Sequence, residues 1–101
     1  MSRYNIEEIS DSIEQEMLST TDLKTIDMII TSFEEAINSG SDYTKDMDIR
    51  TKEFNFEFLC LTSLEISVCE NIIRSLMKTC ERLEEYEMCS RISKILEYYE
   101  S

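Results

Sequence analysis

The four cysteines are the side chains in this 101-residue chain best suited to metal or redox chemistry. They are Cys60, Cys69, Cys80 and Cys89, separated by 9, 11 and 9 residues. Structural zinc sites usually take two cysteine ligands from one tight loop, often together with histidine, and this chain has neither such a loop nor a histidine. The spacing instead places single cysteines on helix faces, where a free thiol packs as a small apolar group. We therefore predict core packing for the cysteines and no metal or other cofactor.

Carboxylates are the most abundant groups for acid–base chemistry, because histidine is absent and 22 Asp and Glu outnumber 10 Lys and Arg. The densest acidic group includes Glu84, Glu85 and Glu87, and it falls at a predicted helix turn with no cleft that the sequence implies. No serine, threonine or cysteine has a base at the spacing of a nucleophilic motif. The paired Glu-x-x-His motifs of di-metal helical sites are also missing. We therefore expect that the protein is not an enzyme.

The net charge of −12 is spread over the whole chain, and no segment is basic. Direct binding to nucleic acid or to an anionic membrane is not expected, because both need a cationic surface. Long-range attraction favours instead a protein partner with a basic surface. The alternative that the charge serves only to keep a small protein soluble stays open.

The pattern of cysteines and apolar runs also bears on the compartment. The sequence shows no signal-peptide pattern, no N-x-[ST] acceptor and no compact disulfide spacing, which favours a reducing cytoplasm. Its longest apolar runs are only a few residues, too short for a transmembrane span.

The elements that position these groups are predicted to be helices, because proline is absent and Gly40 is the only glycine. Capping signals and apolar spacing predict helices over residues 6–18, 22–38, 63–84 and 86–99. Gly40 is expected to end the second helix, and Thr62 with Glu65 to form the capping box of the third. We predict a single all-α domain over residues 1–101, a small helical bundle of four or five helices built from two antiparallel αα-hairpins with a polar connection at 39–48.

Residues 51–61 carry two conflicting periodicities. Phe54, Phe56, Phe58 and Cys60 fall on every second position, which is typical of a strand. Phe54, Phe58 and Leu61 also fit one helical face, and no second segment offers a partner strand. We favour a fifth helix over 51–61, packed between the two hairpins. The alternative is an extended segment that pairs with a second copy of the chain.

The turn between the last two predicted helices resembles two known modules. The string LEEYEMCSRI, residues 83–92, is similar to the turn of tetratricopeptide-type hairpins and to the UVR motif of excision-repair proteins. Tyr86 stands where an aromatic opens the second helix, Cys89 where a small residue follows, and Arg91 where UVR motifs have arginine. The glycine common in tetratricopeptide turns is missing. The resemblance covers residues 79–96 and implies protein docking rather than chemistry.

We therefore expect a small, acidic, non-enzymatic protein that regulates or adapts a partner with a basic surface. The candidate partner-binding residues are an acidic helix face, an aromatic group and the acidic turn: Glu7, Asp11, Glu14, Phe54, Phe56, Phe58, Glu84, Glu85 and Glu87. Two alternatives stay open. One is a viral or phage-type inhibitor of a nucleic-acid-acting enzyme that works by charge mimicry. The other is a structural or assembly protein that acts as an obligate oligomer, in its simplest form a homodimer.

Overall fold

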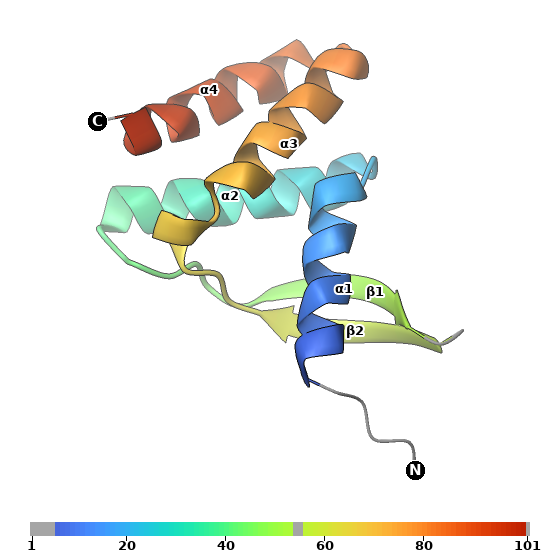
Figure 1. Cartoon of the computed structure of the whole chain (residues 1–101). Helices are drawn as coiled ribbons and strands as arrows, with labels where there is room; N and C mark the ends of the chain where they lie inside the picture. The colour runs from blue at the N-terminus through green and yellow to red at the C-terminus, as the bar shows by residue number, and fades with distance from the viewer. Residues whose placement is uncertain (1–5, 54–55, 101) are drawn as a thin grey trace.

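A computed structural model describes the backbone of residues 6–53 and 56–100, and the side chains of residues 12–50, 57 and 59–100. In chain order the elements are α1 (Ile6–Ser19), α2 (Leu23–Ser39), β1 (Met47–Glu53), β2 (Phe56–Thr62), η1 (Ile66–Val68), α3 (Glu70–Arg82) and α4 (Tyr86–Glu100). Figure 1 shows α3 and α4 above α2, the β-hairpin below it, and α1 running upright from the level of α2 down across the hairpin. The described part of the chain is mostly helical with one small two-stranded sheet, so the predicted all-α class holds only broadly.

Helix α2 forms where the sequence predicts it, because both of its ends are capped. The carboxylate of Asp22 accepts hydrogen bonds from the Thr25 backbone N–H at 3.3 Å and the Thr25 hydroxyl at 2.6 Å. The hydroxyl bond is the main cause of a lowered pKa at Asp22. At the other end Gly40 adopts φ 71° and ψ 23°, the left-handed conformation that glycine takes without steric cost. The expected role of Gly40 is confirmed.

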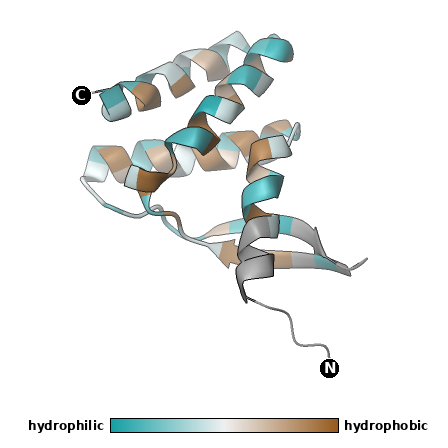
Figure 2. Ribbon diagram, viewed as in Figure 1, coloured by the Kyte–Doolittle hydropathy of each residue, from teal (hydrophilic) through white to brown (hydrophobic). Residues whose placement is uncertain are grey.

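Helix α2 is also the central layer of the core. Its buried face packs between α4 on one side and β1 on the other. Figure 2 shows hydrophobic positions recurring along α2 and α3 between hydrophilic ones, as an amphipathic helix requires. The buried apolar side chains of the core include Ile26, Ile30 and Phe33 from α2, Met47 and Ile49 from β1, Ile73 and Leu76 from α3, and Ile92 and Ile95 from α4.

The helix predicted over 51–61 is wrong, because this segment belongs to a β-hairpin. β1 and β2 pair antiparallel, with Met47 opposite Thr62 and Glu53 opposite Phe56. The partner strand overlaps the end of the predicted polar connection. There Met47 and Ile49 are fully or almost fully buried. Pairing satisfies the backbone of both strands and lets β1 bury these two side chains against the helices, which a helix over 51–61 alone would not do.

The predicted third helix begins later than expected, at Glu70 rather than near residue 63. The backbone of residues 64–66 pairs with the connection before β1 instead. The N–H of Thr44 donates to the Leu64 carbonyl oxygen at 2.9 Å, and the N–H of Ile66 donates to the Asp42 carbonyl oxygen at 2.9 Å. These non-local hydrogen bonds compete with helix formation, so the capping box expected at Thr62 and Glu65 is absent and Thr62 ends β2.

Helices α1 and α2 do not form the predicted antiparallel hairpin. α1 contacts β1 and α3, and Figure 1 shows it crossing the direction of α2. Met17 of α1 is fully buried, and the Ser75 hydroxyl of α3 donates to the Leu18 carbonyl oxygen at 2.8 Å. The physical reason is the hairpin, which offers α1 an apolar surface that the helical prediction did not contain.

Helix α4 agrees with the predicted helix over 86–99 and is joined to α3 by a tight turn. Glu84 in this turn has φ 59°, a left-handed conformation that is costly for a residue with a Cβ atom. It occupies the kind of position that glycine usually takes at a helix end.

Replacing Glu84 by glycine is expected to stabilise the fold by about 0.5 to 1 kcal/mol. Relief of the left-handed strain, about 1 kcal/mol or more, outweighs the extra freedom of glycine in the unfolded chain. Urea unfolding would measure the difference against Glu84→Gln, which removes the same charge and keeps the Cβ atom. If Glu84→Gly is the less stable of the two, the strain at this position is not real.

Candidate partner-binding groove

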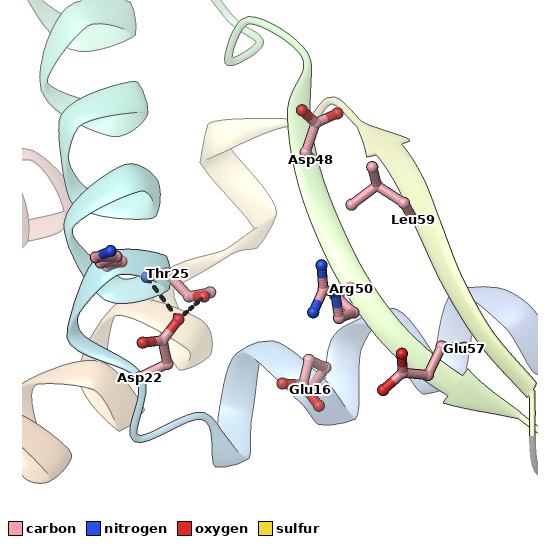
Figure 3. Close-up of a pocket in the computed structure, with 8 residues that line it drawn as sticks. Glu16, Asp22, Thr25, Asp48, Arg50, Glu57 and Leu59 are labelled. Atoms are coloured by element: carbon pink, nitrogen blue, oxygen red, sulfur yellow. Dashed lines mark hydrogen bonds between the residues drawn. The ribbon is translucent and has the colours of Figure 1, made fainter.

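An open groove of about 620 Å³ lies between the α1–α2 junction and the outward face of the hairpin. Figure 3 shows this space with β1 as its floor and the start of α2 as one wall. Four residues from the helices and the N-cap of α2 and four from the strands line it: Glu16, Asp22, Lys24, Thr25, Asp48, Arg50, Glu57 and Leu59. We define these eight residues as the groove.

The alternation of the hairpin determines which side chains reach the groove. Asp48 and Arg50 point away from the core because their neighbour Ile49 points into it. In the register of the sheet Asp48 lies opposite Leu61, and Arg50 lies opposite Leu59. Directly opposite residues share a face, so both leucines lie on the outward face. Leu59 is 65% exposed and Leu61 is 72% exposed, which makes an apolar patch beside the charged residues.

The electrostatic balance of the groove is acidic. Its lining holds four carboxylates against the two cations Lys24 and Arg50. The ion pairs of the described residues join Arg74 to Glu70, and Arg91 to Asp27 and Glu34. Neither Lys24 nor Arg50 therefore forms an ion pair with a described carboxylate of the groove. The groove has carboxylates available for an incoming cation, and the nearby leucines offer an apolar contact.

The residues predicted to bind a partner do not come together in one site. Glu14 is exposed on α1, where it accepts a hydrogen bond from the Asn71 amide at 3.4 Å. Glu84 and Glu87 are exposed and Glu85 is half-buried at the far end of α3. The 13 residues of α3 separate the two places by about 18–20 Å. A single small partner segment does not span both.

The remaining predicted residues lie outside what the structure describes. Phe54 falls in the undescribed stretch between the strands, and the side chains of Glu7, Asp11, Phe56 and Phe58 are likewise outside the described residues. Their assignment as partner-binding residues stays a prediction.

The sequence does not predict the groove, because residues 39–48 are expected to form a polar connection rather than the start of a strand. One signal was present. Met47 and Ile49 alternate with Asp48 and Arg50, and after three further residues the aromatic alternation begins at Phe54. Two alternating runs a few residues apart are typical of a β-hairpin. Neither glycine nor proline lies between the two runs, so the usual sequence signal of a turn is missing.

The cysteines pack as predicted at three positions, since Cys69 and Cys80 belong to the buried core and Cys89 packs against it. Cys80 is fully buried and Cys69 is nearly so, whereas Cys60 and Cys89 are half-buried. Burial raises the pKa of the Cys69 and Cys80 thiols above its ordinary value, which keeps them protonated and weakly nucleophilic. No group of three or more potential metal ligands is found among the side chains that the structure describes. Over the described residues no helix is long and apolar enough to cross a membrane.

Comparison with known proteins yields no relative, since no family model, curated protein or solved structure matches the chain. The resemblance to tetratricopeptide and UVR turns therefore rests on residues 79–96 alone.

Proposed function

We propose that this chain is a small, acidic, non-enzymatic protein that regulates or adapts a protein partner by binding a basic segment of it in the groove. The observation that supports this best is the exposed Leu59 among the carboxylates of Glu16, Asp48 and Glu57. A lysine- or arginine-rich segment with one apolar side chain matches this arrangement. The apolar side chain contacts Leu59, and the cations meet the surrounding carboxylates.

The charge of the whole chain and that of the groove have different roles in this proposal. A net charge of −12 attracts a basic partner from a distance and raises the rate of encounter. Each exposed carboxylate in the groove then contributes only about 0.2–1 kcal/mol to an ion pair. Burial of Leu59 and Leu61 adds affinity that does not depend on salt. We place the protein in a reducing cytoplasm, which suits four cysteines that are all free thiols.

Neutralising three groove carboxylates is expected to weaken the binding of a short lysine-rich peptide with a central leucine by about tenfold at low salt. The variant combines Glu16→Gln, Asp48→Asn and Glu57→Gln, and three pairs of about 0.5 kcal/mol each give this factor. Asp22 is left intact because it caps α2. Fluorescence anisotropy of the labelled peptide would measure the dissociation constant over a series of salt concentrations.

The matched control neutralises three exposed carboxylates away from the groove: Glu35→Gln, Glu97→Gln and Glu100→Gln. It changes the net charge equally and is expected to weaken binding about twofold at most, through the loss of long-range attraction alone. Equal loss of affinity in both variants would mean that the peptide responds to net charge and not to the groove.

The alternative function, inhibition of a nucleic-acid-acting enzyme by charge mimicry, is tested separately. Binding of this protein to such an enzyme should weaken with salt and be competed by duplex DNA. Binding that does not depend on salt, or that DNA does not compete, would exclude charge mimicry.

A further inference from the structure

The outer edge of β2 is an open strand edge in the described part of the chain. Over residues 6–53 and 56–100 the sheet consists of β1 and β2, and the helices α1 and α2 contact β1. Figure 3 shows β2 on the side of β1 away from α2. Alternate residues of β2 direct their backbone N–H and C=O groups to β1, so the others present theirs at the free edge. An edge of this kind is a template for another strand.

β2 lacks the features that usually protect such an edge. Its sequence, FEFLCLT, has no lysine, no proline and a single charge at Glu57. Leu59 and Leu61 are largely exposed on it. Natural edge strands are usually short, charged, bulged or covered. An edge of seven residues with a single charge is a favourable site for pairing with another strand.

The distribution of charge favours a second copy of the chain as the source of that strand. Residues 47–62 contain Asp48, Glu53 and Glu57 against Arg50 and Lys52, a net charge of −1. The remaining −11 of the net −12 lies elsewhere in the sequence. The hairpin is therefore where two copies of this acidic protein approach with little mutual repulsion. A strongly basic partner strand would find only one carboxylate on β2.

We propose that two copies associate by antiparallel pairing of their β2 edges about a two-fold axis at Leu59, which makes one four-stranded sheet. In this register Leu59 faces Leu59 of the second copy, and Glu57 faces Leu61 of the second copy. The two Glu57 carboxylates are then offset by four residues along the strands, about 13 Å, which is beyond the screening length of about 8 Å at physiological salt. No like charges of the two β2 strands lie opposite each other.

Lysine substitutions two residues apart on β2 test this register with opposite expectations. Leu59→Lys places two lysines face to face on the axis and is expected to raise the dimer dissociation constant about tenfold or more. Leu61→Lys instead places each lysine opposite Glu57 of the second copy and is expected to keep the constant within about threefold of the parent protein. Both sites are more than half exposed and both variants change the net charge equally, so each is the control of the other.

Sedimentation equilibrium of the parent protein and of both variants measures the dissociation constant. The parent dimer is expected to strengthen as salt rises, because screening reduces the repulsion between two acidic copies. Groove binding weakens with salt and is measured with a peptide, so either proposal can fail while the other stands. A parent protein that stays monomeric at high micromolar concentration overturns the dimer. Equal weakening by both lysine substitutions overturns the register.

Discussion

Phe33→Ala is expected to lower the free energy of unfolding by roughly 3–5 kcal/mol, the largest effect of any single change considered. The Phe33 side chain is fully buried in the core, with 0% of its surface accessible to solvent, and it is among the largest buried side chains. It belongs to α2, the layer that contacts both α4 and β1. Domains of this size are commonly stable by about 5–15 kcal/mol, so the change removes a large share of the total.

Urea unfolding followed by circular dichroism would measure this loss. Phe33→Leu is the matched control, because it keeps an apolar side chain of similar reach and is expected to cost well under half as much. The amide groups of the hairpin and of the helices should lose protection from hydrogen exchange together, because α2 contacts both β1 and α4. A cost below about 1 kcal/mol for Phe33→Ala would contradict the central place of α2 in the core.

Arg91→Met is expected to cost about 2 kcal/mol, because the Arg91 guanidinium fastens α4 to α2. It donates to the two Glu34 carboxylate oxygens at 2.6 and 3.2 Å, to Asp27 at 2.6 Å and to the Thr31 hydroxyl at 3.0 Å. The hydrogen bonds to Glu34 and Asp27 raise the pKa of Arg91, so it stays charged. Hydrogen bonds to charged groups contribute more than neutral ones, and the side chain is only 34% exposed. Removal also leaves two like charges on one face of α2.

The control for this effect is Arg74→Met. Arg74 pairs with Glu70 on the surface of α3 at 3.1 Å, with both side chains more than two-fifths exposed. Surface pairs of this kind contribute about 0.3–0.5 kcal/mol. The loss in free energy of unfolding, measured by urea unfolding, should therefore be several-fold larger for Arg91→Met than for Arg74→Met. Equal costs would mean that the Arg91 contacts are no more than surface pairing. Arg91 is the residue that matches the arginine of UVR motifs, and in this fold its guanidinium is paired with Asp27 and Glu34 of α2.

The parts of the fold that local signals determine were predictable. Helix α2 has a capping carboxylate at Asp22, a wide apolar stripe and a glycine in the left-handed conformation at Gly40. The sequence predicts an apolar stripe over residues 86–99, and in helix α4 its members Ile92, Ile95 and Leu96 are buried. Neither depends on a distant partner. Each could be read from its own residues.

The hairpin and the groove could not be predicted in the same way because they depend on pairing between segments. Met47–Glu53 carries few apolar residues, and its role appears only when Ile49 lies opposite Cys60 in the sheet. The hydrogen bonds of Thr44 to Leu64 then delay the start of α3. The direction of α1 follows from the hairpin as well. One missed strand therefore accounts for the three corrections to the fold and for the missed site.

Amide chemical-shift mapping tests most directly whether a basic segment binds in the groove. The lysine-rich peptide with a central leucine would be titrated into isotope-labelled protein at moderate salt. The proposal predicts the largest shifts at Glu16, Asp48, Glu57 and Leu59, and their loss when the central leucine of the peptide becomes serine. Largest shifts at the turn of Glu84 and Glu87, with the groove unchanged, would contradict it.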